Sequence, residues 1–326
     1  MPIRKASLRG LSSEIADGVD LFICSASFED RCLSITSALD IRRVRKSIVC
    51  QNRSSYPQMV RNAQRLKNLL SRDCTTIMMD KVDPLLGADS LRRAIDYHVA
   101  IGGVGRVVVD ITTFTHESLL ILIRLLHDRR DAFGELIFAY AAAADYSVGS
   151  PPGEEWLGKG IRDIRSVLGY PGAISAAKGT HLILLVGYER DRAEKLIDQY
   201  EPRSLALGYG DRSSSMTEHH HRVNLALHRN LMSKYRNCTE FRFHPNDPFS
   251  SCIAIEAEIA RPGGLNIVLA PMNTKLSTLG AALACFRHQQ VQLCYASAMK
   301  YNVERYSLAG QDCYIVDEPF GARHDP

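Results

Sequence analysis

Short apolar runs alternate with longer amphipathic stretches along the chain, and this alternation restricts the fold more than any other feature of the sequence. It is typical of βα units arranged around a parallel sheet. The pattern occurs twice, across residues 21–141 and again across 181–295. At 326 residues the chain has the length of two domains, so we expect two α/β domains.

The periodicity assigns an element to each stretch. In the first half we predict strands at 21–25, 47–50, 76–79, 106–111 and 136–141, separated by helices near 30–40, 57–72, 88–101 and 116–129. In the second half we predict strands at 181–186, 204–207, 240–243, 266–270 and 291–295, separated by helices near 190–199, 215–235, 250–260 and 276–287.

The two halves also share residues at matching places. Residues 140–148 read YAAAADYSV, and residues 295–303 read YASAMKYNV, 155 positions later. The first strand of each half ends in an aromatic residue followed by glutamate, Phe28-Glu29 and Tyr188-Glu189. We interpret this as an internal duplication, which predicts two Rossmann-like parallel-sheet halves.

Proline and glycine interrupt the alternation in SPPGEEWLGKG, residues 150–160, which indicates a break between the halves. The predicted domains are therefore residues 1–149 and 178–326, and residues 150–177 are predicted to be a linker or excursion.

Composition narrows the class of protein. A net charge of +4 is too small to require a polyanionic partner, although direct binding of nucleic acid stays open. No stretch approaches the continuous apolar length of a membrane span. Nine cysteines without a CxxC pair, and an N-terminus without an apolar signal core, favour a cytoplasmic protein with reduced thiols.

In parallel sheets, ligands bind at the carboxyl ends of the strands, where helices begin with free N–H groups. This rule points to the loops at 25–31, 110–116, 187–192 and 271–275. The candidate ligand-binding residues there are Ser25, Ser27, Glu29, Arg31, Thr112, Thr113, Thr115, His116, Glu189, Arg192, Asn273, Thr274 and Lys275.

Each candidate has a structural alternative. Ser, Thr, Asp and Asn also cap helices without any ligand. For Lys275 we favour ligand binding over capping. A cation at a helix N-terminus is unfavourable by itself, and a bound anion would explain its presence there. Glu29 and Glu189 would face one cleft if the halves pack as a pseudo-dimer. Such a pair of carboxylates can hold ribose hydroxyls, bind a metal or act as acid and base, and the structural alternative is a salt bridge from each to Arg31 and Arg192.

The Asp110 turn and the Lys275 turn resemble a known family. Residues 107–126, VVVDITTFTHESLLILIRLL, resemble the strand, turn and helix of CARF domains, and residues 266–283, NIVLAPMNTKLSTLGAAL, resemble the matching element with its Thr-Lys pair. The tandem arrangement resembles SAVED domains. The resemblance implies binding of cyclic or linear oligonucleotide second messengers in prokaryotic antiviral defence.

Other motifs point to no cofactor or metal. P-loop, dinucleotide-binding, serine-hydrolase and zincin motifs are missing from the sequence. Consecutive histidines at 219–221 cannot converge on one metal from a helix, and we expect them on its solvated face.

The leading hypothesis is a sensor that binds a nucleotide-like ligand and signals through a protein partner or its own oligomer. The alternatives are an enzyme that cleaves a nucleotide or nucleoside, with Glu29, Asp110 or His116 as acid-base groups, and a scaffold subunit of a multiprotein defence assembly.

Overall fold

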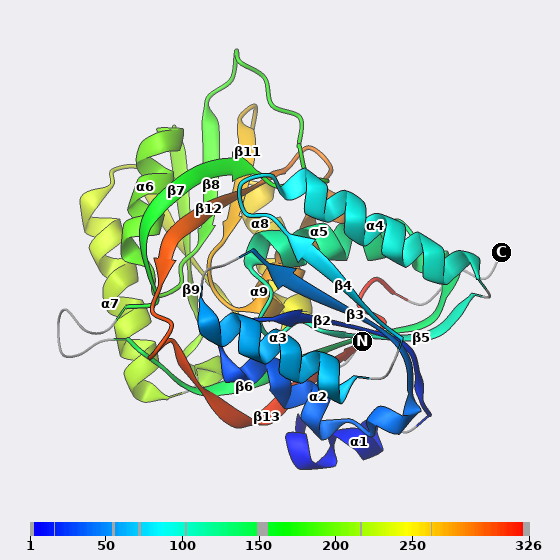
Figure 1. The fold of residues 1–326 in the computed structure, drawn as a ribbon. Helices are drawn as coiled ribbons and strands as arrows, with labels where there is room; N and C mark the ends of the chain where they lie inside the picture. The colour runs from blue at the N-terminus through cyan, green and yellow to red at the C-terminus, as the bar shows by residue number, and fades with distance from the viewer. Residues whose placement is uncertain are drawn as a thin grey trace. The chain divides into compact units, whose positions relative to one another are not determined.

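The protein is represented by a computed structural model, which describes residues 3–15, 17–53, 56–70, 73–101, 103–148, 156–215, 217–261 and 263–321. The chain forms two compact units (Figure 1). Unit 1 comprises Met1–Asp145 and Ser307–Pro326, and unit 2 comprises Tyr146–Tyr306.

Unit 1 contains a seven-stranded sheet of order β1-β13-β6-β5-β2-β3-β4 within the described residues. Its strands are β1 (Ile3–Ser7), β2 (Val19–Ala26), β3 (Val44–Asn52), β4 (Cys74–Met79), β5 (Val104–Asp110), β6 (Phe133–Tyr146) and β13 (Ser307–Asp317). Its α-helices are α1 (Leu11–Glu14), α2 (Ser34–Ala38), α3 (Pro57–Leu69), α4 (Pro84–Ala100) and α5 (His116–His127). Short 3-10 helices lie at Leu8–Gly10, Asp30–Leu33, Ile41–Arg43 and Arg130–Ala132.

Unit 2 contains a six-stranded sheet of order β10-β9-β8-β11-β12-β7, again within the described residues. Its strands are β7 (Gly158–Ser166), β8 (Thr180–Leu185), β9 (Ser204–Gly210), β10 (Cys238–Phe243), β11 (Asn266–Pro271) and β12 (Gln292–Tyr301). Its helices are α6 (Arg190–Tyr200), α7 (Glu218–Lys234), α8 (Pro248–Ile259) and α9 (Lys275–Arg287), with a 3-10 helix at Arg212–Ser214.

The strand pairing of unit 1 recurs in unit 2 residue by residue. In unit 1, Val108 of β5 lies opposite Phe22 on one side and Ile137 on the other. In unit 2, Val268 of β11 lies opposite Leu182 and Gln292 in the same way. Tyr140 and Tyr295 therefore occupy equivalent strands, β6 and β12. The predicted α/β fold with two Rossmann-like halves and an internal duplication is confirmed.

Helix starts are duplicated as well. Both α4 and α8 begin with proline after an aspartate cap: the side chain of Asp83 accepts from Leu85 N, and that of Asp247 accepts from Phe249 N and Ser250 N. Proline suits this position because the first helical N–H has no partner inside the helix. The Asp-Pro pairs at 83–84 and 247–248 mark the same point in both halves.

The structure divides the chain differently from the boundaries predicted at 149 and 178. The segment predicted as a linker, 150–177, contains β7, which joins the unit 2 sheet antiparallel to β12; its residues 150–155 lie outside the described residues. At the other end β13 returns to unit 1, although 178–326 was assigned to the second half. β7 is half-exposed and has no apolar run, and β13 begins with an exposed polar stretch and has an apolar run only over residues 313–316, so neither strand shows a strong periodicity over its length.

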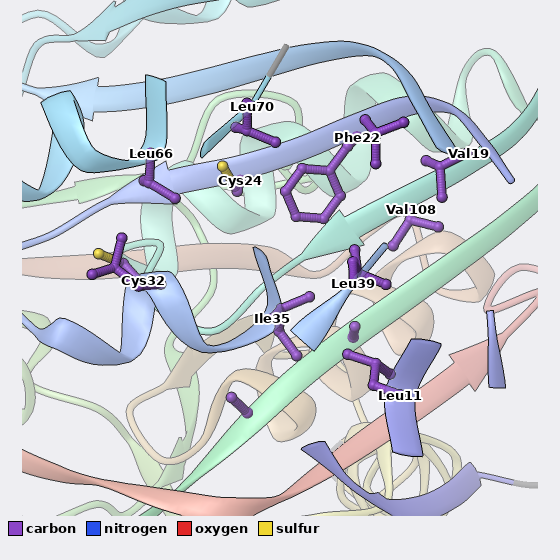
Figure 2. Close-up of a cluster of buried hydrophobic side chains, with 14 of the residues drawn as sticks. Leu11, Val19, Phe22, Cys24, Cys32, Ile35, Leu39, Leu66, Leu70 and Val108 are labelled. Carbon is purple, nitrogen blue, oxygen red and sulfur yellow. The ribbon is translucent and has the colours of Figure 1, made fainter. Parts of the chain in front are cut away.

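The core of unit 1 lies between the sheet and helices α1, α2 and α3 (Figure 2). Phe22 and Cys24 of β2 face Leu11, Ile35 and Leu66 from these helices. Helices α4 and α5 pack together and cover the other face of this sheet (Figure 1). In unit 2, leucines of β8 and β9 pack in the same way against α6 and α7. None of the helices in the described part is long and apolar enough to cross a membrane.

Candidate functional site

In unit 1 the loops after β2 and β5 meet at the carboxyl end of the sheet. Thr113 Oγ1 donates a hydrogen bond of 2.8 Å to the carbonyl of Ser25. Thr112 Oγ1 accepts 2.9 Å from Ala141 N, which ties the same loop to β6. Ser27 Oγ accepts from Glu29 N at 3.3 Å. These hydroxyls were candidates for ligand binding, and the structure uses each of them to hold the loop backbones together.

Glu29 and Arg31 form a buried ion pair in this edge. Arg31 Nη2 donates to Glu29 Oε2 at 2.8 Å, and only 4% and 9% of the two side chains are exposed. Arg31 Nη1 also donates to the carbonyl of Ala141 at 3.2 Å. The hydroxyl of Ser307, from β13, donates to Glu29 Oε2 and accepts from Arg31 Nε. Of the two sequence-based interpretations of Glu29, the salt bridge is the one that the structure shows.

Unit 2 repeats this ion pair. Arg192 Nη1 donates to Glu189 Oε2, and Arg192 Nη2 donates to the carbonyl of Ala296. Ala296 occupies the place in β12 that Ala141 occupies in β6. The guanidinium also lies 5.5 Å from the centre of the Tyr295 ring. In each half, therefore, a buried Arg–Glu pair ties the helix that follows the first parallel strand, Asp30–Leu33 or α6, to the fifth parallel strand, β6 or β12.

Asp110, a candidate acid-base residue, is fully buried at the end of β5. Its Oδ1 accepts 2.9 Å from Thr112 N. Burial raises the pKa of this carboxyl to about 7, although hydrogen bonds from Thr112 and the charge of Arg31 oppose the rise. Asp110 consequently changes its charge near neutral pH, and it does so inside the protein rather than at an open surface.

The helices that follow β5 and β11 begin in the same way. Thr115 accepts from Ser118 N at 3.1 Å to cap α5, and Thr274 accepts from Ser277 N at 3.0 Å to cap α9. Both threonines therefore serve the capping role that the sequence left open. His116 and Lys275 are the first residues of their helices and both are half-buried, so one half places an imidazole where the other places an ammonium group.

Sequence reasoning missed two buried asparagines that brace these edges. Asn62 of α3 donates to the carbonyl of Ser27 at 3.0 Å. Asn224 of α7 donates to the carbonyls of Val186 and Gly187 at 3.0 and 3.1 Å, and accepts from Gly210 N. In the second half Asn273 also donates to the carbonyl of Val186. Only the alignment of α3 with α7 could have singled out Asn62 and Asn224.

Unit 2 gathers aromatic side chains at its carboxyl edge. Tyr146 contacts Tyr188, His220 and Tyr306 with ring centres 6.1–6.5 Å apart. Tyr301 contacts Tyr306 at 6.1 Å, and its hydroxyl lies 3.5 Å from that of Tyr295. We call Tyr146, Tyr188, His220, Tyr295, Tyr301 and Tyr306 the tyrosine cluster.

The expectation that histidines 219–221 all lie on a solvated helix face is wrong for His220. This residue is 2% exposed, and its Nδ1 lies 2.7 Å from the hydroxyl of Thr217, the residue that caps α7. His220 turns inward in the first turn of α7, where it packs on Tyr188 from the loop after β8. A run of three polar residues hides which one faces the core.

The thiol at the unit 1 edge does not supply a nucleophile at neutral pH. Burial raises the pKa of the Cys32 thiol beside the Glu29 loop to about 12, so it stays protonated at neutral pH. In the part of the chain that the structure describes, no three His, Cys, Asp or Glu side chains gather as a metal site would require. The side chains at the carboxyl edges of the two sheets include cations, hydroxyls and aromatic rings.

Comparisons with known proteins return little. No protein-family model matches the sequence, and no curated protein matches it. Among solved structures, the chain is similar to the cytoplasmic domain of a prokaryotic cation chloride cotransporter, with 9% sequence identity and a TM-score of 0.26. The likeness covers 88% of this chain and 98% of that chain. A TM-score this low gives no basis for transferring a function.

Proposed function

We propose that this protein is a sensor that binds a nucleotide-type ligand at the carboxyl edge of the unit 2 sheet. One observation carries the proposal: the edge that begins α9 with Lys275 also holds the tyrosine cluster. A lysine at a helix N-terminus suits a phosphate, whose charge the N–H groups also favour. Aromatic rings suit a nucleobase, which stacks on them.

The two carboxylates considered for catalysis, Glu29 and Asp110, support binding over cleavage. Glu29 is engaged by Arg31 and Ser307, so its carboxylate is not available to move a proton to or from a substrate. Asp110 is fully enclosed. A general base has to come within hydrogen-bond reach of the substrate, and neither carboxylate is placed for this.

The resemblance of the Asp110 and Lys275 turns to CARF domains supports a finer form of the proposal. In this form the ligand is a cyclic or linear oligonucleotide messenger of prokaryotic antiviral defence. The protein then passes the signal to a partner protein or through its own assembly.

A nucleotide panel tests the proposal. The purified chain is mixed with mononucleotides and with cyclic and linear oligonucleotides, binding is measured by calorimetry, and the recovered ligand is analysed by chromatography. Binding with unchanged ligand supports the sensor. Turnover would establish the enzyme instead, and absence of binding across the panel would favour the scaffold.

A further inference from the structure

Ser307 and Gly158 occupy equivalent positions in the two halves. Ser147 N donates to the carbonyl of Tyr306 at 3.2 Å, and Asn302 N donates to the carbonyl of Leu157 at 3.0 Å. Ser147 and Asn302 are themselves equivalent residues in the repeated YAxAxxYxV segments. The next residue along each returning strand is Ser307 in β13 and Gly158 in β7.

The Ser307 hydroxyl completes the ion pair of unit 1. It accepts from Arg31 Nε at 3.1 Å and donates to Glu29 Oε2 at 2.5 Å. One hydroxyl thus satisfies a donor and an acceptor at once, which is what a buried ion pair requires beyond its own contact.

Gly158 cannot supply this hydroxyl in unit 2. Among the residues that the structure describes, Arg192 Nε and Glu189 Oε1 are buried without a hydrogen-bond partner. The two side chains are only 5% and 10% exposed. An unsatisfied donor and an unsatisfied acceptor in one buried ion pair cost free energy. A single hydroxyl group would satisfy both of them.

We infer that a ribose hydroxyl of the ligand fills this place between Arg192 and Glu189. The inference rests on the proposed function and adds the group that the site recognises. A hydroxyl both accepts from Nε and donates to the carboxylate, whereas an ionised phosphate oxygen only accepts and an ammonium group only donates.

The surroundings suit a nucleoside. The tyrosines at 295, 301 and 306 lie close enough to Arg192 to act on its charge. Tyr301 and Tyr306 are half-buried, and they turn aside to admit the sugar to a pair that is closed from solvent in the free protein. A single water molecule is the competing occupant, since it also accepts and donates.

The test uses the only tryptophan of the chain, Trp156, which lies two residues before Gly158. Its emission is followed while the full-length protein is titrated with the four ribonucleoside 5′-monophosphates and with their 2′,3′-dideoxy counterparts. We expect the dideoxy compounds to bind at least tenfold more weakly, because they leave the buried pair unsatisfied.

Two matched variants locate the effect. Gly158→Ser supplies the hydroxyl from the chain itself, once the Glu189 carboxylate has turned away from an added Cβ that would lie 2.3 Å from Oε1. It should raise the melting temperature and weaken ribonucleotide binding at least tenfold. Ser307→Gly creates the same shortage in unit 1; it should lower the melting temperature and leave the Trp156 titration unchanged.

The outcomes separate the two proposals. Equal binding of ribo and dideoxy compounds would overturn the hydroxyl inference and leave nucleotide binding intact, and this comparison needs no variant to fold. A Gly158→Ser protein that is more stable but binds as before would assign the place to water and overturn the inference. If no compound in either series binds, the hydroxyl inference falls, and the proposed function falls with it when the oligonucleotides of the nucleotide panel do not bind either.

Discussion

The two halves share a backbone plan and differ in how their carboxyl edges are completed. In unit 1 the Arg31–Glu29 pair is closed by Ser307, and a buried aspartate, Asp110, lies at the end of β5. In unit 2 the Arg192–Glu189 pair lacks such a hydroxyl and lies beside Tyr295, while Lys275 begins the helix that follows β11. Duplication preserved the interactions that fix the fold, while the polar groups around them diverged. The proposed function accordingly places the ligand at the unit 2 edge.

The largest expected effect comes from removing either buried arginine. Arg31→Met and Arg192→Met each leave a buried carboxylate without its cation, which costs about 3–5 kcal/mol. Arg192→Met should be the more costly, because Glu29 keeps the Ser307 hydroxyl and Glu189 has no equivalent. Urea unfolding measures both, and Arg42→Met, at an exposed pair, should leave the unfolding curve in place. A larger loss of unfolding free energy for Arg31→Met than for Arg192→Met would contradict this difference between the two edges.

Asp110 of unit 1 should make its own contribution to the pH dependence of stability, alongside the buried His181, His228 and Glu258 of unit 2, whose pKa values burial also shifts. The folded protein holds a proton on Asp110 up to about pH 7, while the unfolded chain releases it near the ordinary pKa of 3.8. The contribution of Asp110 to stability therefore falls as pH rises from about 4 to 7, by up to about 4 kcal/mol, and levels off above that range. The charged and titratable groups that act on Asp110 are Arg31 and the thiols of Cys24 and Cys32.

The measurement is the difference between wild type and Asp110→Asn in urea unfolding at several pH values. The variant keeps an acceptor for Thr112 N and should lose this part of the pH dependence. Parallel curves for the two proteins between pH 4 and 7 would show that Asp110 is already ionised in the folded state.

Lys275 and His116 test the two helix starts against each other. Lys275→Ala should weaken binding of an anionic ligand from the nucleotide panel by about 1.5–3 kcal/mol, the range for hydrogen bonds to charged groups. His116→Ala should cost less. Stability should barely change with Lys275→Ala, because Thr274 provides the cap. Calorimetry and thermal melting measure the two effects, and a large loss of stability would place Lys275 in a structural ion pair.

The smallest expected effect is the difference in stability loss between Asn224→Ala and Asn62→Ala. Asn224→Ala removes donors to two carbonyls and an acceptor for Gly210 N, whereas Asn62→Ala removes donors to Ser27 O and Asp30 Oδ1. We expect losses of about 2 kcal/mol for Asn224 and about 1 kcal/mol for Asn62. Denaturant unfolding of both variants ranks them, and the reverse order would show that α3, not α7, is the more firmly held helix.

The sequence alone determined the parallel strands and the helices between them, because buried strands and amphipathic helices leave apolar periodicity in the chain. Val107–Val109 is such a run and was assigned as a strand that the structure contains. The duplication was also visible, since Tyr140 and Tyr295 begin matching segments. The carboxyl ends of these strands followed from the same assignment, and with them the loops that carry the candidate residues.

Only the tertiary structure decided which of those residues are engaged with one another. Ser307 reaches Glu29 across 278 positions of sequence, and no local pattern connects a serine in a polar strand to a distant ion pair. The inward orientation of His220 depends on the tertiary packing in the same way. So does the missing hydroxyl at Gly158, which leaves Arg192 Nε and Glu189 Oε1 without a hydrogen-bond partner. Periodicity records which side of an element is buried, whereas hydrogen bonds between distant loops depend on the completed packing of the sheet.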